Sequence, residues 1–292
     1  MRNSKAIVTM AVGGRYMEDW RKVCESNWRA YAERHGYDII CIDHLLDESP
    51  RGRGRRFTWQ KCLILEQESV QRYERVVWLD ADILINVDLA PCMTAGVPPE
   101  KVGVPNGWWA PSPEWRHECL RRTYEYFGAD SVVNYDPHEY YRQYGFPKTF
   151  DAAPTNGTMV LSPAHHRELL KRNYYDYEDR GIRWNDEMRP FAYEVMNAGC
   201  AHWLDPRFDL NWWEWRIMNY PFLVNPPYPR RFDQRVRRKL ARWLGSDSYT
   251  DMPRACVNAT FCQCFSLHFT SNTKDDMLIV DPTIKSSLDC RM

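Results

Sequence analysis

Apolar residues occur in short continuous runs that alternate with longer stretches of helical periodicity. Three of these runs predict strands, at 5–11, 39–42 and 75–79. Between them, 16–35 and 58–73 repeat apolar residues at helical spacing, and Gly36 stands where helices commonly end. Because strands and helices alternate, we expect a parallel sheet whose connections are right-handed crossovers.

The rest of the chain shows fewer regular patterns. Its further predicted elements are a charged loop at 46–56, a helix at 114–127 that ends at Gly128, a strand at 157–161, and helices near 163–179 and 186–198. The Tyr-rich segment 130–150 has no clear pattern. Since no repeat, low-complexity tract or linker interrupts these elements, we predict one domain over 1–292 with a C-terminal extension.

Composition removes one class of partner. The chain has 292 residues, of which 39 are basic and 39 acidic, so its formal net charge is zero. A nucleic-acid-binding domain usually carries a basic surface, and we therefore expect no nucleic-acid partner. Aromatic residues make up 14% of the chain, and aromatic faces suit the apolar faces of sugars, although most must simply pack the core.

The cysteine spacing near the C-terminus allows two interpretations. Cys256, Cys262 and Cys264 precede His268 and could form a zinc site or a disulfide. The Cys-x-Cys spacing lacks the usual two-residue spacer of zinc sites, and no second pair accompanies it.

The segment 229–244 stands apart by its charge. It holds seven cationic side chains and one acid, with apolar residues on one helical face. This pattern predicts a basic amphipathic helix. Such a helix either contacts an anionic membrane surface peripherally or packs on the core by its apolar stripe.

Asp80 and Asp82 follow the strand 75–79 directly. Open α/β sheets bind ligands at the carboxyl ends of their strands, so both carboxylates should lie at the binding edge. Carboxylate oxygens suit Mg²⁺ or Mn²⁺, and such ions commonly bridge a diphosphate. The motif alone also occurs in solvated turns, but two neighbouring patterns strengthen it.

Those patterns are Asn27-x₃-Tyr31-x₃-His35-Gly36-Tyr37 and the segment Thr58-Trp59-Gln60-Lys61. Together with Asp-x-Asp they resemble GT-A-fold glycosyltransferases, in particular the family of galactosyl-, xylosyl- and mannosyltransferases, and more distantly the glycogenin-like retaining enzymes. The resemblance covers 5–90 well and the remainder patchily. It implies an α/β, Rossmann-like fold with a mixed, mostly parallel central sheet flanked by helices and a C-terminal helical extension.

The resemblance also divides the chain by task. It implies a nucleotide-sugar-binding half at 1–105, a donor-sugar and acceptor half at 106–228, and a C-terminal segment at 229–292 that returns to the metal site. The implied metal ligands are Asp80, Asp82 and His268, for Mn²⁺ or Mg²⁺. The implied donor-binding residues are Thr9, Ala11, Asp43, Arg56, Lys61, Asn156 and Gly157. The retaining relatives have His-Gly-x-x-Lys-Pro-Trp at the C-terminal histidine, and this chain departs from that motif after His268, which leaves Lys274 as a further phosphate candidate.

Asp186 and Glu187 resemble the family's acidic pair near the anomeric carbon, where Asp186 would bind sugar hydroxyls and Glu187 would stabilise the transition state or orient the acceptor. Acids at a helix N-terminus are favoured by the dipole in any case. Similarly, His268 could be an ordinary core histidine. The stretch 204–212 resembles an acceptor-side element, so Asn211, Trp212 and Trp213 are candidates for an acceptor groove, although core packing explains them equally well.

We therefore predict a metal-dependent, retaining glycosyltransferase that moves a sugar from a UDP-sugar, with GDP-mannose as the less favoured donor, to an oligosaccharide or glycolipid acceptor. One alternative is a sugar-nucleotidyltransferase. Such an enzyme needs a Gly-rich, basic phosphate-binding loop after the first strand, and Gly13-Gly14-Arg15 is only a short version of it. Another is a non-catalytic carbohydrate-binding protein, which would have no need of the Asp pair.

The sequence also suggests where the enzyme works. No apolar run approaches the roughly 18–20 residues that span a membrane, and the N-terminus lacks the apolar region of a signal peptide. Golgi transferases carry a membrane anchor. We therefore expect a cytoplasmic enzyme of bacterial or viral origin, peripheral to a membrane if 229–244 binds lipid.

Overall fold

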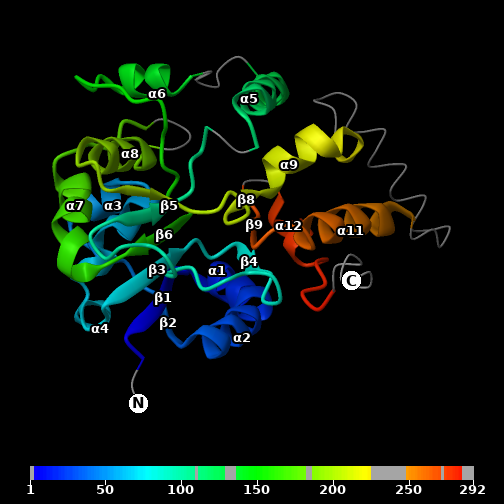
Figure 1. Cartoon of the computed structure of the whole chain (residues 1–292), viewed down its shortest axis with the longest axis horizontal. Coiled ribbons are helices and arrows are strands. Elements are labelled where there is room, and N and C mark those ends of the chain that lie inside the picture. The colour runs from blue at the N-terminus through cyan, green and yellow to red at the C-terminus, as the bar shows by residue number, and fades with distance from the viewer. Residues whose placement is uncertain are drawn as a thin grey trace.

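The computed structural model describes residues 3–108, 111–128, 136–181, 186–224, 248–270 and 273–284. Its strands are β1 (Lys5–Met10), β2 (Tyr37–Ile42), β3 (Arg75–Leu79), β4 (Ile83–Ile85), β5 (Val102–Val104), β6 (Thr158–Leu161), β7 (Ala201–Trp203), β8 (Leu210–Asn211) and β9 (Ser266–His268). They form a six-stranded sheet in the order β2-β1-β3-β6-β5-β7 and a three-stranded sheet in the order β4-β9-β8 (Figure 1).

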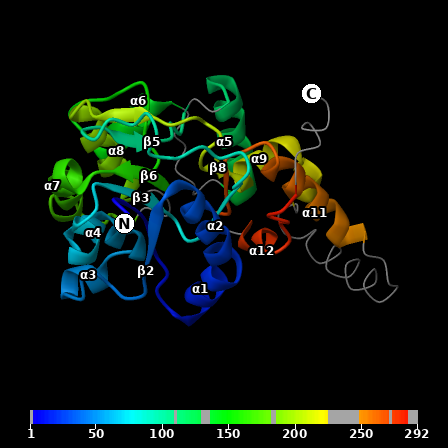
Figure 2. The same ribbon diagram turned by 60° about the horizontal axis from the view of Figure 1, so that its bottom comes forward.

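Helices surround both sheets (Figures 1 and 2). The α-helices are α1 (Gly14–Asp19), α2 (Glu25–His35), α3 (Pro50–Gly54), α4 (Glu68–Gln71), α5 (Pro113–Phe127), α6 (Pro137–Tyr144), α7 (Pro163–Tyr175), α8 (Met188–Asn197), α9 (Trp212–Asn219), α11 (Ser248–Phe261) and α12 (Lys274–Met277). A π-helical turn, η1 (Trp20–Cys24), joins α1 to α2, and the described residues also form two 3₁₀ helices, η2 (Phe57–Glu66) and η3 (Pro221–Leu223).

The six-stranded sheet is mixed and mostly parallel. Strands β2, β1 and β3 are parallel, and β7 is parallel to β5. Only β6 runs against its neighbours β3 and β5. The predicted fold class is therefore confirmed, with the carboxyl ends of β1 and β3 at one edge, where ligand sites are expected.

Alternate residues of β1 and β3 pack into two apolar layers. Ile7 and Val77 contribute to a core that contains α2, the smaller sheet and part of α11. Val8 and Trp78 belong to a second core with η2, α4, α7 and α8 on the opposite face. Burial on both faces explains why these strands are continuous apolar runs, as is usual for parallel sheets.

The smaller sheet brings the C-terminal part of the chain back to the Asp pair. Strand β9 is antiparallel to β4, and His268 is the register partner of Ile83. Strand β8 lies parallel on the other side of β9, with Asn211 beside His268. The segment around His268 therefore lies beside the strand that follows Asp82. The reason is that β4 follows Asp82 directly and offers β9 a free edge.

Several predicted helices need correction in detail. The stretch 16–35 is helical and ends at Gly36 in the left-handed conformation (φ 70°), as expected, but it contains the π-helical turn. The stretch 58–73 is mainly the 3₁₀ helix η2 followed by α4. Seven consecutive residues of η2 are buried, so packing on every side replaces the one-sided burial of an ordinary surface helix. The loop 46–56 contains α3, which Ser49 caps.

Two interpretations of the C-terminal region have different outcomes. Cys256, Cys262 and Cys264 are free thiols, and among the described residues none of them joins a cluster of metal-binding side chains. Neither a disulfide nor a metal-binding cluster is therefore found at these cysteines within the described chain. The basic segment 229–244 lies outside the described residues. In the described part of the chain, no helix combines the length and apolar character needed to span a membrane.

Candidate metal centre and substrate cavity

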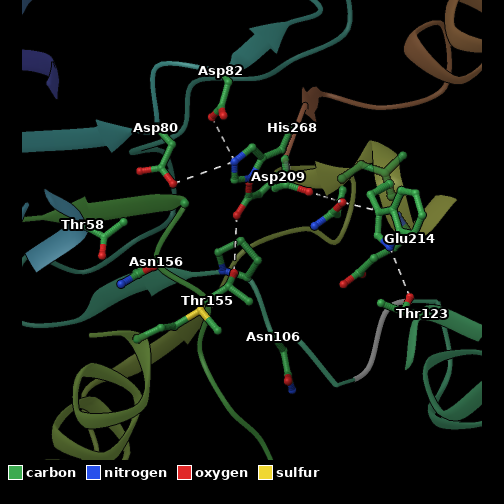
Figure 3. Close-up of a pocket in the computed structure, with 18 of the residues that line it drawn as sticks. Thr58, Asp80, Asp82, Asn106, Thr123, Thr155, Asn156, Asp209, Glu214 and His268 are labelled. Atoms are coloured by element: carbon green, nitrogen blue, oxygen red, sulfur yellow. Dashed lines mark hydrogen bonds and ion pairs between the residues drawn. The ribbon is translucent and has the colours of Figure 1, made fainter. Parts of the chain in front are cut away.

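The turn between β3 and β4 presents two carboxylates to one side chain of β9. The Nε2 atom of His268 lies 3.2 Å from Asp82 Oδ1 and 3.9 Å from Asp80 Oδ2. One ligand atom from each residue can be chosen so that all three lie within 4.8 Å of one another. In Figure 3 the three side chains converge at one wall of a cavity. The predicted grouping of Asp80, Asp82 and His268 is therefore present.

A fourth residue, Asp209, fixes the orientation of the histidine. Its Oδ1 atom lies 2.7 Å from His268 Nδ1, which leaves Nε2 directed at the other two carboxylates. Asp209 is itself held by its backbone N–H, which donates to Ser266 Oγ at 2.8 Å. It adopts φ 59°, a left-handed conformation that Asp tolerates better than most residues. A carboxylate behind a metal-ligating histidine is a frequent supporting contact.

Sequence reasoning missed Asp209. The residue lies within the stretch 204–212, which was singled out for an acceptor role, but nothing in the linear pattern pairs it with His268. The pairing arises because β8 and β9 are adjacent in the smaller sheet. The only available signal was an acidic residue within that stretch.

Two lysines neutralise the carboxylates. Lys61 Nζ lies 2.8 Å from Asp80 Oδ1 and 3.8 Å from Glu187 Oε1, and Lys274 Nζ lies 3.1 Å from Asp82 Oδ2. Burial alone would lower the pKa of Lys61, but the charges of Asp80 and Glu187 outweigh it and raise the pKa. Burial would raise the pKa of Asp82, yet His268 and Lys274 hold that pKa well below its ordinary value. Asp82 is therefore ionised.

The donor set fits a divalent cation. Two carboxylates and one imidazole are suitable ligands for Mn²⁺, and Asp82 needs no deprotonation before it binds. Burial acts to lower the pKa of His268, but Asp209 and Asp82 raise it well above its usual range. His268 would hold a cation through Nε2 in place of a proton, and the negative charge that stabilises the imidazolium would then stabilise the metal.

Gly157 makes room for this arrangement. Gly157 lies just before β6, next to Asn156. Its carbonyl oxygen accepts a hydrogen bond from the backbone N–H of Asp80 at 2.9 Å. A Cβ atom at position 157 would lie 2.8 Å from His268 Cε1 and 2.9 Å from Asp209 Oδ2. Glycine is therefore required by the histidine and its carboxylate, independently of any ligand.

Glu187 is held by three polar groups. Thr58 Oγ1 donates to its Oε2 at 2.8 Å, Asn156 Nδ2 donates to its Oε1 at 3.4 Å, and Lys61 lies beside it. The neighbouring residue Asp186 is 1% exposed, and its Oδ1 has no hydrogen-bond partner. Burial, together with a hydrogen bond to Asp179, raises the pKa of Asp186 to about 7.

These groups line one cavity of about 780 Å³, shown in part in Figure 3. The predicted site residues that line it are Arg56, Lys61, Asp80, Asp82, Asn156, Gly157, Asp186, Glu187, His268 and Lys274. Thr9, Ala11 and Asp43 do not line it: the first two are buried in the sheet, and Asp43 is exposed at the end of β2. Their predicted contacts with a nucleotide stay predictions.

The fold is shared with known structures, although the sequence is not close to them. No protein-family model matches the chain, and no curated protein matches its sequence. The structure of the bifunctional glycosyltransferase WbbM superposes with a TM-score of 0.53 at 12% identity, over 95% of this chain and 49% of WbbM. This chain thus spans about half the length of that protein. The likeness establishes a GT-A glycosyltransferase fold.

Two other solved structures give lower TM-scores. A glycosyltransferase involved in glycosylation of the major capsid of PBCV-1 gives 0.49 at 12% identity, over 94% of this chain and 100% of that one. The galactosyltransferase LgtC, in complex with donor and acceptor sugar analogs, gives 0.44 at 11% identity, over 98% of this chain and 100% of LgtC.

Proposed function

We propose that this chain is a metal-dependent glycosyltransferase that transfers a sugar from a nucleotide diphosphate sugar, with UDP as the favoured nucleotide, to a saccharide-containing acceptor. The observation that carries the proposal is the Asp80–Asp82–His268 cluster at the wall of a large cavity, at the carboxyl edge of β3. The GT-A fold supports it, since this is where such a sheet binds its ligands.

The cluster would hold the cation, and the two lysines would hold the phosphates. When bound, a divalent cation acts as a Lewis acid on the leaving diphosphate. Lys61 and Lys274 pair with the metal ligands themselves, so their ammonium groups would lie beside a diphosphate held by the cation. Both lysine ammonium groups would then add to the stabilisation of the leaving group.

The other polar groups would bind the donor sugar. The buried, unpartnered Oδ1 of Asp186 can accept a hydrogen bond from a sugar hydroxyl, which would remove the cost of leaving it unpaired. Glu187 is fixed by Thr58, Asn156 and Lys61, and its carboxylate would stabilise positive charge that develops at the anomeric carbon. We propose retention of configuration, with the leaving phosphate accepting the acceptor proton on the same face.

The proposal is tested by thermal stabilisation with UDP and GDP, each with and without Mn²⁺. Ligands that bind the folded state raise its melting temperature by mass action. We expect a Mn²⁺-dependent rise with UDP in the wild type that disappears in Asp82→Ala. Asp88→Ala removes an exposed acid three residues after β4 and should keep the shift. No rise with either nucleotide would overturn the proposal and favour a carbohydrate-binding protein.

A further inference from the structure

The cavity continues beyond the metal cluster to a second wall made by two helices. Cavity-lining residues of α5 are Trp115, Arg116, Leu120, Thr123, Tyr124 and Phe127, and α9 contributes Trp213 and Glu214. Helices α5 and α9 lie side by side in both views of the molecule (Figures 1 and 2). In Figure 3, Glu214 and Thr123 lie across the cavity from Thr58 and Asn156.

The second wall combines aromatic rings with hydrogen-bonding groups. Phe127 and Trp213 pack with ring centroids 5.1 Å apart, and Trp213 Nε1 donates to Thr123 Oγ1 at 3.3 Å. Beside these rings, Arg116 Nη1 lies 2.5 Å from Glu214 Oε1. The side chains of Arg116 and Glu214 are only 13% and 25% exposed, so the pair is largely removed from solvent.

Arg116 has unused hydrogen-bonding capacity. Its Nε atom is buried and has no hydrogen-bond partner, and its guanidinium lies 5.6 Å from the ring of Trp108, whose Nε1 is also buried and unpartnered. Buried donors without partners are uncommon in folded proteins, and each calls for an explanation such as a bound water, an ion or a role in a site.

Charge at this wall selects among ligand classes. The charges of Arg116 and Glu214 cancel, and Glu214 would repel a phosphate or carboxylate placed against the pair. A neutral ligand with an apolar face and several hydroxyl groups satisfies every feature. Its face can lie on the half-buried rings of Trp115, Tyr124 or Phe127, which the buried Trp213 supports from behind. Its hydroxyls can donate to a carboxylate and accept from a guanidinium.

We infer that α5 and α9 form an acceptor subsite for a neutral pyranoside. Arg116 and Glu214 would bind its hydroxyl groups, and the aromatic side chains would pack against its ring face. This inference rests on the proposed function, because an acceptor must share the cavity with the donor. It adds the class of acceptor and the residues that would determine specificity.

The test is saturation-transfer difference NMR with methyl glucoside, galactoside and mannoside in both anomeric forms, in the presence of UDP and Mg²⁺, which is diamagnetic. We expect ring C–H signals for at least one pyranoside. Glu214→Gln preserves the side-chain volume and should weaken that binding about tenfold or more, since hydrogen bonds to charged groups are the strong ones. Glu125→Gln changes an exposed acid of α5, the other helix of this wall, and should leave binding unchanged.

Two results would overturn the inference: no saturation of any pyranoside by the wild type, or equal binding by the wild type and Glu214→Gln. The nucleotide-dependent thermal shift of the same variants separates this inference from the proposed function. A normal shift without pyranoside binding rejects the subsite alone. Pyranoside binding that depends on Glu214 but is accompanied by no nucleotide shift supports the subsite and rejects the transferase.

Discussion

His268 Nδ1 lies 2.7 Å from Asp209 Oδ1, and this contact turns the opposite nitrogen of the ring toward Asp80 and Asp82. His268 is the last residue of β9, and Asp209 immediately precedes β8. The smaller sheet therefore sets the geometry of the metal centre as much as the Asp-x-Asp turn does.

We expect Asp209→Asn to weaken Mn²⁺ binding about 10- to 100-fold, because the carboxylate behind a ligating histidine fixes its tautomer and raises its basicity. Isothermal titration with MnCl₂ measures the affinity directly. Asp205→Asn serves as the control. Asp205 lies on the same segment, but its side chain is 36% exposed and pairs with Arg207. Equal affinities of Asp209→Asn and the wild type would show that Asp209 plays no part in metal binding.

Gly157→Ala should disrupt the metal centre without touching a ligand residue. The new Cβ would lie within 3 Å of both His268 and Asp209, so one of them must move. We expect loss of Mn²⁺ binding, measured by the same titration, with circular dichroism to confirm that the variant is folded. Gly54→Ala places its Cβ in open space and should bind Mn²⁺ like the wild type. A Gly157→Ala variant with unchanged affinity would contradict the packing argument.

Lys61→Met should destabilise the folded state most strongly when no metal is bound. The Lys61 side chain is 7% exposed, and its removal leaves Asp80 and Glu187 without their cation, at a cost of about 3 kcal/mol. Urea denaturation with and without Mn²⁺ measures this, and we expect added Mn²⁺ to recover part of the loss in the variant, since the cation compensates Asp80. Lys61→Arg keeps the charge and should lose less stability in urea without Mn²⁺. A loss that is independent of Mn²⁺ would indicate that Lys61 is not coupled to the metal centre.

Asp186 should give the protein a pH-dependent stability of defined sign. Its pKa is about 7 in the folded state, above the value of about 3.9 for an unfolded chain, so the folded state holds the proton more tightly. The stabilisation is complete below about pH 4 and disappears as the pH rises through 7. Asp186→Asn cannot ionise, so it should show a smaller fall in urea midpoint between pH 5 and pH 8 than the wild type. Parallel pH profiles would contradict the burial of an ionisable Asp186.

Much of the site follows from local pattern. A continuous apolar run followed by Asp80 and Asp82 places two carboxylates at the end of a buried strand, and a run of apolar residues around His268 indicates a strand near the C-terminus. These inferences hold because period and burial are properties of a few neighbouring residues. The same is true of α5, whose limits are marked by a Ser cap and by Gly128.

Only the tertiary structure decided which distant groups meet. Asp209 reaches His268 because β8 pairs with β9, and Arg116 reaches Glu214 because α5 packs on α9. The partners lie far apart along the chain, and no linear motif links them. The 3₁₀ geometry of η2 likewise depends on burial from every side. Local sequence determines the element and its chemistry, whereas the packing of elements, summed over many weak contacts, determines which chemical groups form a site.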